Sequence, residues 1–369
     1  MRNGIIVLNT IILNLAICIL YAERGIERRM TDKFFSSNDD IHLCENCSLV
    51  AIDLVGRDLR YAKLKNAKLD AADMLGAKLD WADLSNATLS NVRLTYASLN
   101  QAILNEANLV DATLDYAQLI KVDCRDCEAY AASFMQTIAI EANFFNGKLE
   151  DADFQNATVS RAIFQNAKLS RAKFNGTEAI AANFKNATLR AARFVNAIID
   201  SSDFLGCDLH QANFKGVSAL SINFTDADLR YTNFFKAKLN DTNFSKAILK
   251  NAYFVKAELA DAIFTDANYE NANFAGANLL GAKDFNEHTA GIILCETTMP
   301  DGSTGNIRCD KAQPIINFLN QEELQREEAE KRAKEKALEA PQKKNIDKDK
   351  VDKDKVDKDK DKKDGQAAK

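Results

Sequence analysis

The chain has 369 residues, of which 48 are Lys or Arg and 53 are Asp or Glu, and its formal net charge at pH 7 is −5. A chain of this length ordinarily holds two globular domains, but an uninterrupted short repeat excludes that organisation here. The three histidines, His42, His210 and His288, lie far apart in the sequence, and no group of residues stands out as a catalytic centre.

Residues 1–22 are predicted to be a targeting segment. Arg2 provides a basic start, residues 4–20 are mainly apolar, and Ala22 offers a small residue for cleavage. The predicted location is therefore periplasmic or secreted. The alternative is an uncleaved inner-membrane anchor, because the apolar run nearly reaches the length that spans a bilayer. Processing as a lipoprotein at Cys18 is disfavoured, since the apolar run continues past this residue.

After a predicted N-terminal cap at residues 23–43, residues 44–285 follow a five-residue repeat. Large apolar residues recur without a register slip from Leu49 to Leu279, which makes 47 repeat centres, and 38 of them are Leu or Phe. A small residue, usually Ala, stands two positions before each centre. The period fits neither an α-helix, at about 3.6 residues per turn, nor a flat strand, at about 2. We therefore expect the chain to turn once per pentad.

Four such pentads would close a square coil of 20 residues with both the centre and the small residue pointing inward. The next coil, about 4.8 Å above, would pair with the open backbone groups of the coil below it. The sequence therefore predicts an all-β solenoid in which each coil contacts only its neighbours. All three prolines, Pro300, Pro314 and Pro341, lie beyond the repeat. Their absence from the repeat suits a structure in which almost every amide donates to a ladder.

Phenylalanines mark the second half of the repeat. Every tenth residue from Phe134 to Phe274 is Phe, whereas the intervening centres are mostly smaller, and the centres before Phe134 are nearly all Leu. Ten residues is half a coil, so the rings should occupy two opposite sides of the tube. The core centres that we single out are Leu54, Leu64, Phe134, Phe144, Phe154, Phe164, Phe254 and Phe264.

Stretches such as "ADLSNATLSNVRL" and "ANFAGANLLGA" resemble those of pentapeptide-repeat proteins. The resemblance covers residues 44–285. It implies a right-handed quadrilateral β-helix of about 12 coils, on the order of 55 Å long at one strand spacing per coil. The segment "LCENCSLVAIDL" resembles the C-x-x-C entry of exported members, and "LCETTMPDGSTGNIRC" resembles their terminating loop.

Eight cysteines favour an oxidising compartment. In the pairs Cys44/Cys47 and Cys124/Cys127 the first residue is a repeat centre and the second an inward position, so each pair permits a local disulfide. A zinc site between the two pairs is disfavoured, because residues 80 positions apart would lie about 19 Å from each other. By resemblance to the terminating loop, a disulfide is expected between Cys295 and Cys309.

The C-terminal cap is predicted at residues 286–340, with a disulfide loop followed by a helix that begins at Pro314. Residues 341–369 alternate Lys and Asp and contain almost nothing to bury, so this tail is expected to be disordered.

Two functions remain open on the sequence alone. The first is a non-enzymatic exported scaffold that binds an unknown protein partner, with no cofactor, metal or nucleic acid. The second follows from the family resemblance, since some members mimic B-form DNA and bind DNA gyrase, a type II topoisomerase. Between Ser48 and Phe285, however, the chain has 28 acidic and 25 basic residues. A mimic of duplex DNA, with one negative charge per about 1.7 Å, should be far more acidic.

Overall fold

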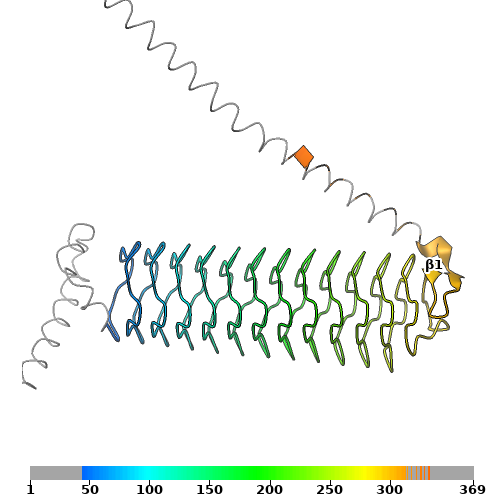
Figure 1. Cartoon of the computed structure of the whole chain (residues 1–369), viewed down its shortest axis with the longest axis horizontal. Coiled ribbons are helices and arrows are strands. Elements are labelled where there is room, and N and C mark those ends of the chain that lie inside the picture. Colours follow the sequence, from blue (N-terminus) through cyan, green and yellow to red (C-terminus); the bar gives the residue numbers. More distant parts are fainter. Residues whose placement is uncertain are drawn as a thin grey trace, which may run out of the picture. The chain divides into compact units, whose positions relative to one another are not determined.

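The computed structural model describes residues 44–312, together with positions 314, 317, 321, 325, 328, 331 and 332. The chain divides into two units, Met1–Ala312 and Gln313–Lys369. The first unit is a stack of similar coils that follow one another along the sequence (Figure 1). The predicted targeting segment, the N-terminal cap and the Lys/Asp tail lie outside the described residues.

One turn in each pentad bends the chain. In the turn that follows Leu59, the amide of Ala62 donates to the Leu59 carbonyl oxygen at 3.1 Å. The third residue of this turn, Tyr61, has a φ of 64°, as in a type II turn. A positive φ recurs at this position in nearly every pentad. Asn, Asp and Gly are frequent there because they adopt left-handed backbone at low cost.

Four pentads close one coil, because each bridge residue pairs in parallel with the residue 20 positions away. Lys63 pairs with Asp83, which in turn pairs with Ile103. The Leu64 amide donates to the Asp83 carbonyl at 2.7 Å, and the Asp83 amide donates to the Ala62 carbonyl at 2.8 Å. Backbone groups that a single coil would leave open are thus satisfied by the next coil. This arrangement confirms the predicted β-solenoid, while its right-handed sense stays a prediction.

The core is a continuous column of side chains inside the coils. Each core centre named above is at most 1% exposed, and the small residues before the centres, such as Ala62 and Ala67, are fully buried. Ala fits there because the side chain lies close to the wall of the tube. Burial of this kind contributes about 25 cal/mol per Å² of apolar surface.

From Phe134 onward the rings form two stacked columns. Phe134 stacks on Phe154 with ring centroids 4.6 Å apart and an interplanar angle of 2°. Phe144, in the other column, meets Phe134 edge-on at 5.8 Å and 79°. Both geometries are favourable for aromatic pairs. The partly buried ring of Phe285 lies edge-on to Phe264 and Phe274 and covers the C-terminal end of the columns.

Several inward positions carry a hydroxyl or thiol in place of Ala. Thr177 donates to the Phe154 carbonyl at 2.6 Å, and Ser202 donates to the Ala179 carbonyl at 2.6 Å. The thiol of Cys207 makes the same kind of contact with the Phe184 carbonyl at 2.8 Å. Its burial raises the pKa of the Cys207 thiol strongly. Cys207 therefore replaces Ser or Thr in the wall of the tube and is not a reactive cysteine.

A hairpin ends the stack. Strand β1 (Leu294–Thr298) pairs antiparallel with β2 (Thr304–Ile307). The parallel ladder continues past residue 285, since Asn278 pairs with Thr298. The Thr297 hydroxyl also donates to the Phe274 carbonyl at 2.8 Å, which fixes β1 on the last coil.

Residues 309–312 are helical, so the prediction that helical structure begins at Pro314 is wrong by five residues. The described positions of Gln313–Lys369, from 314 to 332, are also helical. No helix among the described residues has the length and apolar character needed to cross a bilayer.

We predict that Phe144→Ala destabilises the solenoid by about 3–5 kcal/mol, because it removes a buried ring and leaves a cavity between neighbours. Phe145→Ala is the matched control, since its ring lies in the partly exposed turn next to Phe144, and it should cost less than about 1 kcal/mol. Urea unfolding measures both. Equal losses would contradict the assignment of Phe144 to the core.

We also predict that Cys207→Ser changes stability by less than about 1 kcal/mol, because a hydroxyl makes the same contact at Ser202. The thiol of the wild-type protein should react with iodoacetamide only after unfolding, as measured by mass spectrometry. Rapid labelling of the folded protein would show that the thiol is accessible.

Candidate protein-interaction surface

The cysteines singled out from the sequence form three disulfides, Cys44–Cys47, Cys124–Cys127 and Cys295–Cys309. The first two link a repeat centre to the inward position of the next pentad. Cys124 and Cys127 are at most 1% exposed, so this pair is closed to solvent and acts as a staple. The third disulfide joins β1 to the residues that follow β2 and closes the terminal loop.

The described residues hold no group of three or more His, Cys, Asp or Glu side chains able to bind a metal ion. Of the two described histidines, His210 packs edge-on against Tyr231 with centroids 5.4 Å apart. His288 lies 3.9 Å from a Glu287 carboxylate oxygen with its side chain 84% exposed.

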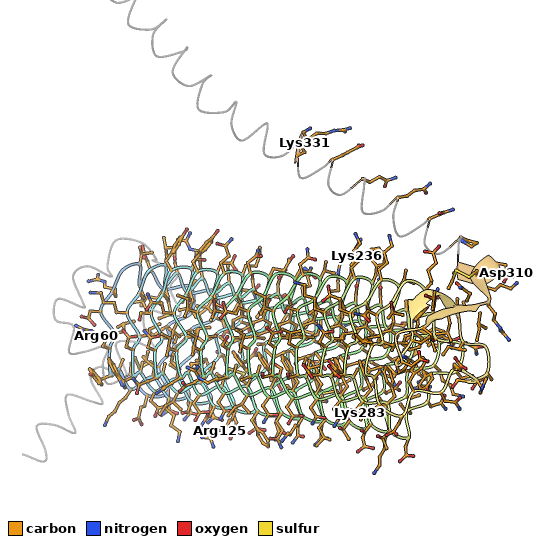
Figure 2. All side chains as sticks on the ribbon, turned by 45° about the vertical axis from the view of Figure 1, so that its right-hand side comes forward. Arg60, Arg125, Lys236, Lys283, Asp310 and Lys331 are labelled. Atoms are coloured by element: carbon orange, nitrogen blue, oxygen red, sulfur yellow. A yellow bond between two sulfur atoms is a disulfide. The ribbon has the colours of Figure 1, made fainter. Side chains whose placement is uncertain are left out.

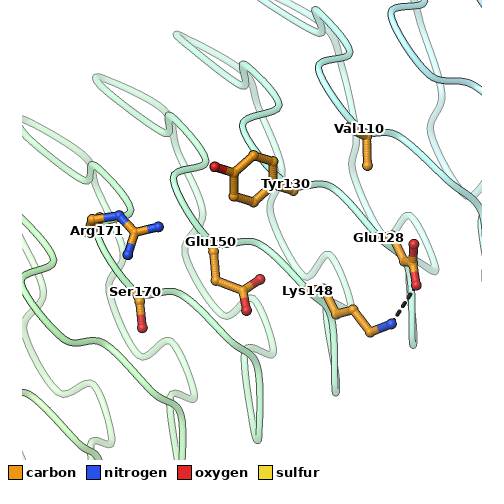
Figure 3. A pocket seen from close by; sticks show the side chains of 7 residues that line it. All are labelled: Val110, Glu128, Tyr130, Lys148, Glu150, Ser170 and Arg171. Carbon is orange, nitrogen blue, oxygen red and sulfur yellow. Dashed lines mark hydrogen bonds and ion pairs between the residues drawn. The ribbon is translucent and has the colours of Figure 1, made fainter.

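A shallow depression of about 480 Å³ lies on the side of the coils (Figure 3). Its side chains come from four successive coils, and the Lys148 ammonium forms an ion pair with Glu128 across it. The lining residues are Val110, Glu128, Tyr130, Lys148, Glu150, Ser170 and Arg171. Arg171 is likewise paired, with Asp151.

Exposed aromatic residues form two short ladders on the N-terminal coils. Tyr61 stacks on Trp81 with centroids 5.1 Å apart and an interplanar angle of 7°. Tyr96 stacks on Tyr116 at 4.9 Å and 23°. All four are between 44% and 65% exposed, and Trp81 is the one tryptophan of the chain. Large aromatic side chains are rarely placed together in solvent without a partner to cover them.

The two ladders flank one face of the solenoid. Each aromatic residue occupies the third position of its turn, where φ lies between 58° and 64°. The bridge residues of the intervening face, Asp58, Lys78, Ser98 and Gln118, pair in succession between the coils. The ladder of Tyr61 and Trp81 lies along one edge of this face, and that of Tyr96 and Tyr116 along the other. We call the four aromatic residues with these four bridge residues the aromatic face.

Charged side chains such as Arg60 and Arg125 project from the coils (Figure 2). Arg60, next to Tyr61, donates to Asp58 at 2.8 Å. This hydrogen bond lowers the pKa of the Asp58 carboxyl to about 2, so the pair stays charged at any physiological pH. Exposed Tyr and Trp side chains beside polar ones are typical of protein-binding surfaces.

The aromatic face was not predicted from the sequence. Its signal was present, since Tyr61 and Trp81 are 20 residues apart, as are Tyr96 and Tyr116. That spacing equals one coil, so it places the rings in register.

A family model described as "Pentapeptide repeats" matches the chain in eight copies. The matched residues are 47–86, 87–126, 140–176, 180–216, 222–259 and 252–283. No curated protein matches the chain in sequence.

Among solved structures, HetL of the cyanobacterium Nostoc sp. strain PCC 7120, a pentapeptide repeat protein involved in heterocyst differentiation regulation, is 23% identical. The match covers 78% of this chain and 98% of HetL, with a TM-score of 0.20. A trypsin-treated form of QnrB1, a plasmid-mediated fluoroquinolone resistance protein, is 18% identical over 58% of this chain and 95% of its own, with a TM-score of 0.28.

Rfr23 of the cyanobacterium Cyanothece 51142, also a pentapeptide repeat protein, is 32% identical over 27% of this chain and 61% of its own, with a TM-score of 0.18. The family model alone carries the assignment, because it matches more than half of the residues, within the coils that the backbone ladder defines. The protein therefore belongs to the pentapeptide repeat family.

Proposed function

We propose that this pentapeptide repeat protein is a non-enzymatic, exported scaffold that binds a protein partner through its aromatic face. The observation that supports the proposal is the pair of exposed ladders. They contain the chain's one tryptophan and three of its eight tyrosines, stacked in pairs. Trp and Tyr are the residues most enriched in the parts of interfaces that dominate binding.

The backbone beneath the ladders favours tight binding. The rings are fixed to turns whose amides are bonded to neighbouring coils, as in the Tyr61 amide that donates to the Asp80 carbonyl at 3.0 Å. A preformed surface loses little conformational entropy on association. The partner surface should offer apolar side chains to the two edges of the aromatic face and polar groups to the row of bridge residues between them.

Export is supported by the apolar segment at residues 4–20 and by three disulfides in one chain, since such bonds persist in oxidising compartments. The alternative, a DNA mimic that binds a type II topoisomerase, is less well supported. Basic residues such as Lys215 and Lys236 lie on the coils, where a duplex mimic would need carboxylates.

We predict that Tyr61→Ser with Trp81→Ser reduces partner capture at least tenfold, because removal of an interface anchor typically costs about 2 kcal/mol or more. The readout is photo-crosslinking in the envelope fraction followed by mass spectrometry. Ser is tolerated in this turn, as Ser201 and Ser221 show. Tyr231→Ser is the matched control, since Tyr231 occupies the same turn position and is 49% exposed. Equal capture by the two variants would rule out the aromatic face as the binding site.

A separate prediction concerns export. The intact mass of the protein from the exported fraction of the cells should correspond to a chain that begins near Glu23. Before reduction, only Cys207 should be alkylated, and only when the protein is denatured. Reduction should release the six thiols of the three disulfides. Full-length, fully alkylated protein in the cytosol would overturn the proposed location without bearing on the aromatic face.

A further inference from the structure

A row of aliphatic side chains continues the aromatic face along the same side of the solenoid. The bridge residues of this side run on from Gln118 to Ser218, each paired with the next coil. Two of them, Ile138 and Ile198, are 42% and 43% exposed. The first turn residues that follow the bridge residues add two exposed aliphatic side chains and two half-buried ones. We call these six residues the aliphatic strip: Ile120, Ile138, Ile140, Ile180, Ile198 and Leu220.

Apolar exposure is concentrated on this side of the coils. Among residues 44–312, sixteen large apolar side chains are exposed, and ten of them lie on this side or at its two edges. The opposite side, with its own two edges, has four. Clustered apolar side chains on the surface of a soluble protein mark a site that another molecule covers.

The large side chains of the strip are not a by-product of core packing. At three positions two coils apart, the core centre is Ala and the residue after it, in the turn, is Ile or Leu. The three Ala centres are fully buried. A repeat that served the core alone would place the larger residue at the centre, as at Leu119. The three pairs are Ala139 and Ile140, Ala179 and Ile180, and Ala219 and Leu220.

Residues 18 positions apart on this side lie next to each other. The Ser160 hydroxyl donates to the Glu178 carboxylate at 3.3 Å, and the Ser218 hydroxyl donates to the Asp200 carboxylate at 2.9 Å. The same spacing makes neighbours of two isoleucine pairs, so the strip contains two aliphatic clusters three coils apart. The pairs are Ile120 with Ile138 and Ile180 with Ile198.

The charge of this surface is acidic between the two edges. The bridge and first turn positions from 118 to 220 hold two carboxylates, those of Glu178 and Asp200, and no Lys or Arg. At one edge, Lys121 and Arg161 both form ion pairs with Glu141, at 3.4 Å and 2.9 Å. A partner that covers the strip should therefore carry Lys or Arg opposite the two carboxylates.

The backbone beneath the strip is closed to a partner strand. The Ile138 amide donates to the Ala117 carbonyl at 3.1 Å, and the Ile138 carbonyl accepts from the Leu119 amide at 2.7 Å. The Ile198 amide likewise donates within the ladder, to Thr177 at 2.9 Å. A partner segment finds no open edge to extend as a β-strand. It must satisfy its own backbone hydrogen bonds, as an α-helix does.

The spacing of the strip also fits a helix. Its first turn residues Ile140, Ile180 and Leu220 recur every two coils, about 9.6 Å apart at the usual strand spacing. Residues seven positions apart on one side of a helix are separated by about 10.5 Å, whereas residues on one face of a strand recur every 6.7 Å or so. With three residues between corners, the side of a coil is about 10 Å wide, close to the helix diameter of about 10–12 Å.

From these observations we propose that the aliphatic strip binds an amphipathic α-helix of the protein partner, laid along the solenoid. The inference rests on the proposed function, because the strip continues the aromatic face, and it specifies the chemistry of the partner. A helix of about 16 residues spans the 24 Å or so from the coil of Gln118 to that of Ser218. Its apolar residues recur every three or four positions and cover the strip.

A second copy of the chain fits the strip less well. An antiparallel copy centred on the strip would place Asp200 over Ile140, since their coils are equally far from the midpoint. A copy in the parallel orientation, related by an axis along the solenoid, would place Glu178 over Glu178. Each arrangement buries a carboxylate without a partner of opposite charge, which is costly.

The test places a photo-crosslinking amino acid at position 138 or 198 of the full chain and maps the crosslinked partner residues in the envelope fraction by mass spectrometry. The two positions lie three coils apart, about 14 Å. Along a helix this distance corresponds to about 10 residues, and along an extended strand to about four. We expect both crosslinks in one partner segment, about 10 residues apart. That segment, synthesised as a peptide, should gain helical circular dichroism when mixed with the purified protein.

Variants of the strip test its role in binding this peptide. Ile138→Thr with Ile198→Thr should weaken binding at least tenfold, because it removes apolar surface from both clusters. Thr158 occupies the same bridge position, so Thr is compatible with the ladder there. The matched control is Ile103→Thr with Ile248→Thr, at bridge positions of other sides that are 37% and 40% exposed. The control should bind within about twofold of the wild type.

Several outcomes would overturn the inference. These are no crosslink from either position, crosslinks only to a second copy or to lipid, crosslinked residues about four apart, a peptide that gains no helicity, or equal loss in the strip variant and its control. If Tyr61→Ser with Trp81→Ser still reduces capture, such a result leaves the proposed function intact. If that variant captures the partner normally, the proposed function fails whatever the strip binds.

Discussion

The structure depends on one constraint, the parallel backbone ladder between residues 20 positions apart. An amide such as that of Leu64 finds its acceptor, Asp83, only if every coil contains the same number of residues. An insertion of one residue within a coil would move every later donor away from its acceptor and turn the core centres toward solvent. The uninterrupted register from Leu49 to Leu279 follows from this requirement.

The same ladder separates packing from surface chemistry. In each pentad two positions face the tube and must be apolar or small, as Ala142 and Phe144 are. The bridge residue and the two turn residues remain outside in most pentads, where substitution costs little stability, whereas the turn residues Phe235 and Val255 are buried. Because equivalent positions of successive coils stack on each other, similar residues at these positions form a column along the solenoid. The two aromatic ladders are such columns.

The two ends require separate solutions, since a tube built by repetition leaves its last coil without a neighbour. At the C-terminal end, Phe285 lies against the phenylalanine columns, and β1 supplies ladder partners for the final coil. The Cys295–Cys309 disulfide holds the hairpin closed. At the start of the described coils, the Cys44–Cys47 disulfide fixes the first turn.

The sequence by itself determined the coil, because the five-residue period and the sizes of residues such as Leu54 and Phe134 are local properties that allow one way of burying them. It also placed the C-x-x-C cysteines within reach of each other. Only the tertiary structure decided what the outside presents. Tyr61 and Trp81 become a stacked pair because a positive φ directs both side chains outward from the same corner of neighbouring coils. Ile138 and Ile198, 60 positions apart in the sequence, lie on one side only because the ladder keeps their coils in register.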